Sequence, residues 1–421
     1  MKLAVAALCV AAACVAAIWT VVGLAAGGDL DPTFSGDGWV RTLELKSGSE
    51  FRLTRGAEDV AVQPDGKLVV VGGMIDGNSA SYFGAVRYLP DGSLDLSFAG
   101  RGWTALDLGS FERAYAVAAQ RDGKIVVGGE TLCPRAMCFA LVRFTPDGTL
   151  DRSFGEGGVV RTMFATCGCA VTDLALQPDG RIVAAGWRNR GGDAQDSVLF
   201  ALARYLPSGE LDPSFSRDGR VSIDFGYGRD IAAAVALQRD GRIVVAGRSG
   251  ATEDEFVVAR LRPDGRLDRT FSADGKAAID FGRTWSDGAN GLALGRGGRI
   301  LVAGGSGKRY SAPRVAVAEL RSNGSLSWKR LLRPGPHGGY AEDVVQLRDG
   351  SVVAGGRAFE DDRLDASDWL LVRLGAGGGV VRSDFGTGAD WVAELALQPD
   401  GKLVAAGSIY ASHGVARYRL P

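Results

Sequence analysis

Short apolar strands alternate with glycine turns along almost the whole chain. One phrase recurs: a strand of small and apolar residues, an Asp-Gly type of turn, a β-branched strand, and a second glycine six residues after the first. The turn glycines lie 51 to 61 residues apart and are Gly66, Gly123, Gly180, Gly241, Gly298, Gly350 and Gly401. The second glycines are Gly72, Gly129, Gly186, Gly247, Gly304, Gly356 and Gly407. A period of this length predicts a repeat architecture.

Each repeat contains four strand-like segments. In the second repeat, residues 115–120 form a first strand, and the Asp-Gly turn that follows favours a tight hairpin. The next strands are expected at residues 124–127, 139–144 and 159–164. Four antiparallel strands in a repeat of this size predict the blade of a β-propeller.

The two ends of the chain complement each other. Residues 415–421 correspond to a third strand, and the segment that should follow it is found at residues 28–40 instead. The sequence therefore predicts an all-β fold, a seven-bladed β-propeller of four-stranded antiparallel blades, closed by an N-terminal outer strand that completes the last blade. Such closure would remove the exposed edges of an open array.

Two phrases carry a family resemblance: D-G-K-[IL]-V-V and P-D-G-x-L-D-x-S-F. They resemble the delta-60 repeat of bacterial β-propellers, whose blades are NHL-like, over about residues 28–421. The resemblance implies a propeller in exported bacterial proteins and carries no general activity. The fifth and sixth repeats depart from the pattern, because residues 296–298, 322–324 and 377–379 replace the usual turns.

Composition and the first residues bear on location. The chain is 46% hydrophobic and 23% charged, which is a globular balance. A net charge of −1 gives no basic surface for nucleic acid. Lys2 precedes an apolar stretch, so residues 1–26 read as a signal peptide and residues 27–421 as the propeller. An uncleaved membrane anchor is the alternative, and only then is the membrane a partner. Both place the propeller outside the cytoplasm, secreted or in the cell envelope.

Four cysteines follow this N-terminal stretch: Cys133, Cys138, Cys167 and Cys169. An even number in an exported protein favours disulfides. A zinc site with four thiolates is the alternative.

The repeated L-D-x-[ST]-F phrase suggests structure more than chemistry. Its aspartates could bind calcium, but each occurs once per blade between Leu and Phe, which favours a local turn with Phe packed between blades. These aspartates are Asp31, Asp95, Asp151, Asp212 and Asp268. Neither His337 nor His413 lies in a catalytic motif, so no catalytic residue is predicted.

Carboxylates recur at one position of the first strand in several blades, including Asp173 in the third. In a closed ring Asp59, Asp343 and Glu394 belong to neighbouring blades and should lie near one mouth of the central channel. Converging carboxylates repel one another unless a cation lies among them. Two interpretations follow, a divalent cation site or hydrogen-bonded capping of the inner strands. No other cofactor is expected.

The loops opposite the Asp-Gly turns vary in length and carry aromatic residues beside arginines. Variable loops on a regular scaffold are where binding sites usually lie. The candidate binding residues are Phe51, Arg52, Trp187, Arg188, Arg190, Trp285, Tyr310 and Phe359. The sequence thus favours an exported, non-catalytic scaffold that binds an unknown protein or glycan. The alternative is a metal-assisted hydrolase or lyase that uses the channel carboxylates.

Overall fold

The computed structural model describes residues 29–42, 44–47, 49–109, 111–164, 168–191, 197–250, 254–282, 286–307, 312–361, 365–375, 378–386 and 388–419. The predicted signal peptide or anchor at residues 1–26 lies outside them. Within these ranges the chain forms β-strands and two 3-10 segments, η1 (Phe98–Gly100) and η2 (Arg296–Gly298), and contains no α-helix. A search of the same ranges finds no helix long and apolar enough to span a membrane.

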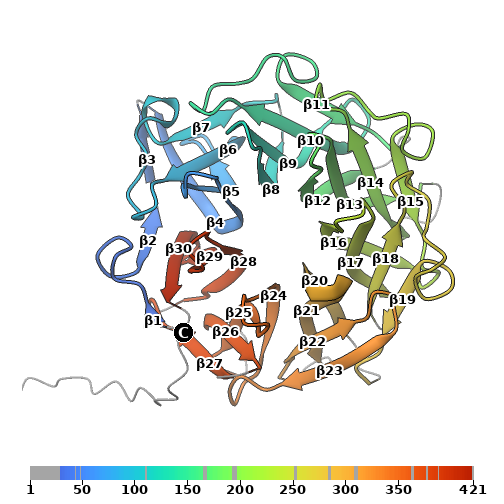
Figure 1. Ribbon diagram of the computed structural model, residues 1–421. Coiled ribbons are helices and arrows are strands. Elements are labelled where there is room, and N and C mark those ends of the chain that lie inside the picture. Colours follow the sequence, from blue (N-terminus) through green and yellow to red (C-terminus); the bar gives the residue numbers. More distant parts are fainter. Residues whose placement is uncertain are drawn as a thin grey trace, which may run out of the picture.

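The strands form antiparallel sheets arranged around a common axis, as in a β-propeller (Figure 1). The first sheet has the order β3-β4-β5-β6-β7, with β3 (Glu44–Ser47), β4 (Ser49–Val62), β5 (Leu68–Ile75), β6 (Ser81–Tyr88) and β7 (Trp103–Leu106). The second has the order β11-β10-β9-β8, with β8 (Glu112–Ala119), β9 (Ile125–Leu132), β10 (Met137–Phe144) and β11 (Val159–Thr162).

Two further antiparallel units are joined by one parallel residue pair, Val198 with Arg229. One contains β12 (Cys169–Leu176), β13 (Ile182–Asn189), β14 (Val198–Tyr205) and β15 (Arg220–Ile223). The other contains β16 (Arg229–Leu237), β17 (Ile243–Gly250), β18 (Glu255–Leu261) and β19 (Lys276–Ile279).

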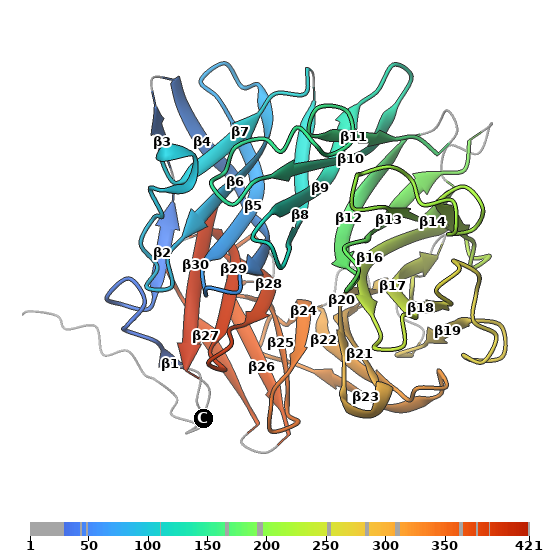
Figure 2. The ribbon, with the colours of Figure 1, turned by 45° about the horizontal axis from the view of Figure 1, so that its top comes forward.

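Three sheets complete the described chain. They contain β20 (Ser286–Leu294), β21 (Ile300–Gly307), β22 (Arg314–Leu320) and β23 (Leu326–Leu332); β24 (Gly339–Gln346), β25 (Val352–Phe359), β26 (Ser367–Leu374) and β27 (Gly379–Ser383); and β28 (Trp391–Leu397), β29 (Leu403–Ile409) and β30 (Ser412–Arg419) with β1 (Asp29–Leu30) and β2 (Trp39–Thr42). The first full strand of each unit lies nearest the axis (Figures 1 and 2). We call β4, β8, β12, β16, β20, β24 and β28 the inner strands.

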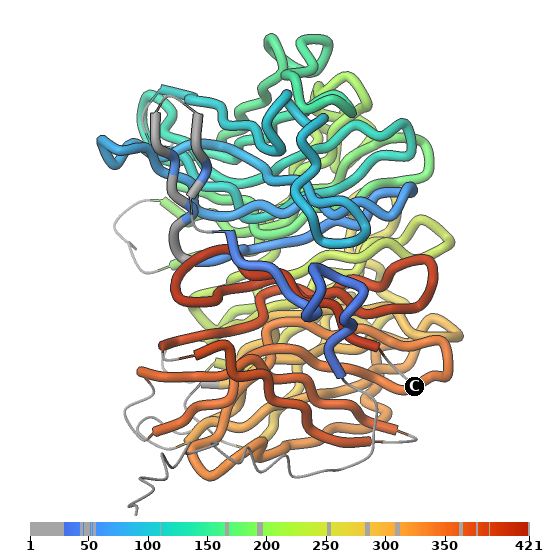
Figure 3. The backbone as a smooth tube through the Cα atoms, turned by 90° about the vertical axis from the view of Figure 1, so that its left-hand side faces the viewer, coloured from blue at the N-terminus to red at the C-terminus, as the bar shows by residue number. Residues whose placement is uncertain are grey.

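The N-terminal segment lies against the C-terminal strand. Both β1 and β2 pair antiparallel with β30, and Figure 3 shows this segment running beside the end of the chain. Asp31 accepts a hydrogen bond from Arg417 Nε at 2.9 Å, and Lys402 Nζ lies 2.9 Å from the same carboxylate. Burial would raise the pKa of Asp31, but the hydrogen bonds from Lys402 and Thr33 and the charge of Arg417 lower it below the usual value. The two ends are therefore held by buried charge-assisted bonds.

The same cluster recurs between neighbouring sheets. Asp95 accepts bonds from the backbone N–H and hydroxyl of Ser97 and from Arg87 Nε at 2.8 Å. Arg87 also donates to the Pro146 carbonyl of the next sheet, and its guanidinium lies over Phe98. Equivalent Arg–Asp pairs are Arg143–Asp151, Arg204–Asp212, Arg260–Asp268 and Arg417–Asp31. The predicted local turn with a phenylalanine packed between blades is thus confirmed.

A β-bulge interrupts every inner strand opposite a glycine of the adjacent strand. The register shifts lie between residues 57 and 59, 114 and 116, 171 and 173, 232 and 234, 289 and 291, 341 and 343, and 392 and 394. A Cβ added at Gly129 would overlap the Arg113 carbonyl oxygen, and one at Gly304 would overlap that of Gly288. The second glycine of each repeat is therefore required by the bulge.

Two sequence expectations need correction or completion. Phe51 and Arg52, expected in a variable loop, belong to β4, which pairs with β3 in a hairpin. The sheets that lack the L-D-x-S-F phrase still have their outer strands, β23 and β27. In the first of these sheets Glu319 takes the usual arginine position and pairs with Arg299.

Gly304→Ala is expected to destabilise the protein by about 3 kcal/mol, because the added methyl group would overlap backbone and also lie 2.9 Å from Phe256. Urea unfolding measures the difference. Gly77→Ala is the matched control, since nothing lies within 4 Å of the corresponding Cβ position. Equal stability of the two variants would contradict the role assigned to the bulge.

Candidate functional site

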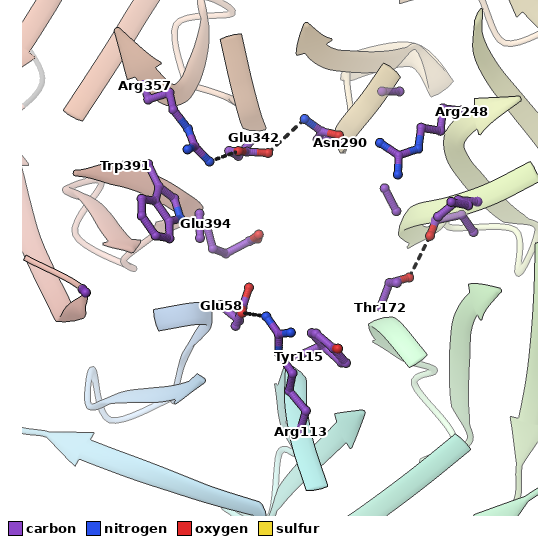
Figure 4. Close-up of a pocket in the computed structure, with 16 residues that line it drawn as sticks. Glu58, Arg113, Tyr115, Thr172, Arg248, Asn290, Glu342, Arg357, Trp391 and Glu394 are labelled. Carbon is purple, nitrogen blue, oxygen red and sulfur yellow. Dashed lines mark hydrogen bonds and ion pairs between the residues drawn. The ribbon is translucent and has the colours of Figure 1, made fainter. Parts of the chain in front are cut away.

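A pocket of about 840 Å³ lies where the inner strands meet around the axis. It opens on the face opposite the Asp-Gly turns, because its lining includes Arg113 near the start of β8 and Arg248 and Arg357 near the ends of β17 and β25. We call this face the variable-loop face and the cavity the channel-mouth pocket. Figure 4 shows the labelled side chains surrounding its centre.

The bulges supply the pocket with one residue from each inner strand. The extra residue of each bulge lines the cavity, and these residues are Glu58, Tyr115, Thr172, Ala233, Asn290, Glu342 and Ala393. Sequence analysis selected the position immediately after the bulge and missed this set. The recurrent spacing between these residues and the second glycine is the signal that could have identified them.

Two ion pairs lie in the wall of the pocket, one between neighbouring sheets and one between neighbouring strands of a sheet. Arg113 Nη2 lies 2.8 Å from Glu58, and Arg357 Nη2 lies 2.9 Å from Glu342. Asn290 donates to the same Glu342 carboxylate at 2.9 Å. Burial raises the pKa of Glu342, although the charge of Arg357 opposes the shift. These bonds hold the polar side chains in one arrangement, so the wall of the pocket is pre-organised.

Aromatic rings support the arginines. The Arg357 guanidinium lies 4.7 Å from the ring centres of both Tyr340 and Trp391. The Arg113 guanidinium lies 4.8 Å from the ring of Tyr115. Cation–π contacts of this kind favour a defined side-chain position. Trp391 also borders the pocket and offers it an apolar surface.

The predicted channel carboxylates have mostly structural partners. Asp59 accepts a hydrogen bond from Val117 N at 2.6 Å, and Asp343 accepts one from Leu395 N at 3.0 Å. Asp173 binds Val235 N in the same way at 2.6 Å. Each aspartate thus caps the inner strand of the following sheet. In the part of the chain that the structure describes, no three His, Cys, Asp or Glu side chains are placed to hold a metal ion.

Glu394 differs from these aspartates because it borders the pocket. Burial raises its pKa well above the usual value, and the charges of Asp343, Asp59 and Asp173 add to the shift. Burial also raises the pKa of Asp343 to about 7, and the two carboxyl groups share a hydrogen bond. Burial raises the pKa of Asp59 to about 6. Burial and mutual repulsion therefore favour the protonated forms of these carboxyls.

The structure divides the residues predicted on the variable-loop face. Trp187 and Arg188 are half-buried on β13, Arg188 donates to Ser222 at 2.7 Å, and the exposed Arg190 pairs with Asp224. These three residues do not line the channel-mouth pocket. Trp285, Tyr310 and the side chain of Arg52 lie outside the described residues.

Phe51 and Phe359 are buried, which corrects the expectation of exposed aromatics at these positions. Phe51 packs against Tyr82 and Trp103 with ring centres 4.9 Å away in both cases. Phe359 packs against Tyr340 at 5.6 Å. Both side chains belong to strands whose inward faces form the core, and they contribute to the packing of the sheets.

Only part of the cysteine prediction is within the described residues. Cys133, in the turn after β9, and Cys138, near the start of β10, form a disulfide. This bond excludes the four-thiolate zinc site, because two of its ligands are consumed. Cys169 is buried, with its sulfur 3.7 Å from the carbonyl oxygens of Met137 and Thr162, and Cys167 lies outside the described residues.

His413 has a structural environment. It is buried on β30 and its ring lies where a Cβ at Gly72 would be, just as Phe83 faces Gly129 and Phe256 faces Gly304. Burial lowers the pKa of His413 to about 3, so the ring is neutral under ordinary conditions. It lies outside the channel-mouth pocket.

Comparison with known sequences supports a β-propeller repeat family. Residues 63–98, 120–154, 177–215 and 238–271 match the family described as "Domain of unknown function (DUF5122) beta-propeller". No curated protein matches the sequence.

Solved structures are similar to this chain at low sequence identity. A catalytically inactive virginiamycin B lyase from Staphylococcus aureus is 10% identical, with 91% of this chain and 100% of that chain covered and a TM-score of 0.51. A streptogramin B lyase is 10% identical, with 91% of this chain and 98% of that chain covered and a TM-score of 0.47. A gluconolactonase from Xanthomonas campestris is 15% identical, with 71% of this chain and 90% of that chain covered and a TM-score of 0.37. The virginiamycin B lyase supports the propeller fold and indicates no activity for this chain.

Asp343→Asn should change the pH dependence of stability. Asp343 keeps its proton up to about pH 7 in the folded protein but loses it near pH 3.8 when unfolded. The contribution of Asp343 to the free energy of unfolding is therefore fully present below pH 3.8, and it is lost as the pH rises through 7. Relative to wild type, the variant should gain about 1 kcal/mol or more in free energy of unfolding between pH 5 and pH 7.

Urea unfolding at pH 5, 6 and 7 measures this difference. His413 contributes the opposite dependence between pH 3 and 6.5, but it is present in both proteins and cancels. Asp122→Asn, in an exposed turn, is the control. A difference between Asp343→Asn and wild type that stays constant over this range would show that Asp343 does not retain its proton.

Proposed function

We propose that this chain is an exported binding module, a closed seven-bladed propeller in which the N-terminal segment completes the last blade. The pairing of β1 and β2 with β30 and the Asp31–Arg417 contact support closure. The Cys133–Cys138 disulfide supports a location outside the cytoplasm. The repeat matches are compatible with the delta-60 resemblance.

The observation that carries the proposal is the channel-mouth pocket. Its size lies in the range of small-ligand sites, and it combines an apolar surface with a few placed polar groups. Its side chains come from bulges in the inner strands, which are hydrogen-bonded within their sheets and packed around the axis. Such a wall needs little ordering when a ligand binds, and this favours affinity.

The partner in this proposal is a glycan or protein whose protruding end enters the pocket. Residues of the variable-loop face would contact the rest of the partner. Trp187, Arg188 and Arg190 are candidates for these outer contacts, as are Trp285, Tyr310 and Arg52. The outer contacts would add specificity to the group bound at the centre.

An alternative function is a hydrolase or lyase that uses the channel carboxyls. The observation favouring it is Glu394, which borders the pocket and whose pKa burial raises well above the usual value, as suits a general acid. If a bound compound is also converted, Glu394→Gln should abolish turnover while changing Kd less than threefold. Equal turnover by wild type and variant would exclude Glu394 as the acid.

Ala233→Trp tests the binding proposal by filling the pocket from a bulge that now carries a small side chain. Glycan and peptide libraries are screened for compounds that raise the Tm of the native protein. Those compounds should leave the Tm of Ala233→Trp unchanged. Arg239→Trp, in the exposed turn at the opposite end of the same sheet, is the matched control and should respond like wild type. Hits that stabilise both variants equally would place binding elsewhere, and an absence of hits would contradict the proposal.

A further inference from the structure

We infer that the channel-mouth pocket recognises an acidic saccharide, with the uronate carboxylate bound by Arg248; the inference rests on the proposed binding function. It names a ligand chemistry for the pocket and assigns Arg248 the role of selecting charge. The argument depends on the charge balance of the lining, the shape of the wall beside Arg248, and the hydrogen-bonding groups that face it.

Arg248 is the cation that the lining leaves for a ligand. Its side chain is exposed and points toward the centre of the pocket in Figure 4. In the described part of the chain no carboxylate lies within ion-pair distance of it, although Asp254 is near enough to sense its charge. The other two arginines of the lining are already paired, with Glu58 and Glu342.

The lining carries three arginines, and two of them are paired with glutamates. Burial raises the pKa of the third lining glutamate, Glu394, well above its usual value and so favours its neutral form. An anion that enters gains the attraction of Arg248 without displacing an existing pair. A carboxylate is well suited, because a guanidinium binds its two oxygens with parallel hydrogen bonds.

The wall of the pocket beside Arg248 is apolar and consists mainly of small side chains. Ile231, Ala232, Ala233 and Ala289 line this side, and Trp391 borders the opposite side. Small side chains leave space next to the guanidinium for a six-membered ring. The C–H faces of a pyranose are apolar, whereas its edges carry hydroxyls. Such a ring fits a pocket in which apolar surfaces of the wall are separated by polar side chains.

The polar groups of the wall can serve hydroxyls as donors and acceptors. The Tyr115 hydroxyl donates to Glu130, so its oxygen can accept a further bond. Asn290 donates to Glu342 and the Ala341 carbonyl through its amide nitrogen, and its amide oxygen can accept. Thr172 donates to the Ala232 carbonyl at 2.9 Å and can also accept. These polar groups, held at fixed positions, suit the hydroxyls of a saccharide.

Isothermal titration calorimetry of the protein tests the inference with a panel of di- and trisaccharides. The panel contains glucuronate, galacturonate or mannuronate at the terminus, the methyl ester of each, and the neutral hexose counterparts. At least one uronate should bind, at least tenfold more tightly than its methyl ester. Arg248→Gln should remove that tenfold preference and Arg248→Lys should retain part of it. Arg239→Gln, which removes the same charge from the opposite end of the sheet, should leave it unchanged.

The outcomes separate this inference from the function on which it rests. Binding of neutral sugars or acidic peptides that Ala233→Trp abolishes would overturn the uronate assignment and keep the binding function. A uronate preference that survives Arg248→Gln would overturn the role of Arg248. If nothing in the saccharide panel binds while library compounds do, the saccharide assignment fails alone. If no compound of any class binds, both proposals fail.

Discussion

The bulge in each inner strand, packed against a glycine, is the constraint on which the remainder of the molecule depends. It sets the carbonyl oxygen of the inner strand so close to the neighbouring strand that no side chain fits at positions such as Gly129 and Gly304. The same distortion turns one extra residue of each inner strand toward the axis. The residue after it points along the ring, where aspartates cap the next strand. Scaffold and pocket therefore arise from one local irregularity.

A second set of interactions holds neighbouring sheets together at larger radius. A buried aspartate orders its own turn, pairs with an arginine, and through that arginine reaches a carbonyl of the next sheet, as Asp95, Arg87 and Pro146 do. The phenylalanine of the same phrase is buried beneath the next sheet's turn glycine, as Phe98 is beneath Gly148. Because Asp31 and Arg417 repeat this arrangement, the ends of the chain are joined by the same chemistry as its interior.

Much of the fold could be predicted because the repeated phrases report local requirements. Asp-Gly turns, β-branched strands and the L-D-x-S-F phrase each depend on a few neighbouring residues. Their structures can therefore be predicted from the sequence alone. The pocket could be predicted only in outline. The sequence placed carboxylates near the channel mouth, but a shift of one residue at the bulge exchanges Asp59 for Glu58 on the pocket wall. Phe51 and Phe359 were assigned to a surface because their environment depends on partners distant in the sequence, Trp103 and Tyr340. Arg248 could not be selected from the sequence, because the structure is needed to show that the other two arginines of the lining are paired with glutamates.

The placement of one lining residue per repeat has a consequence for how the wall of the pocket can vary. Glu58, Thr172 and Ala233 occupy equivalent places, yet they differ in charge, polarity and volume while the surrounding strands stay alike. The wall of the pocket can therefore change in charge, polarity and volume at this position while the residues that form the bulge and its glycine stay the same.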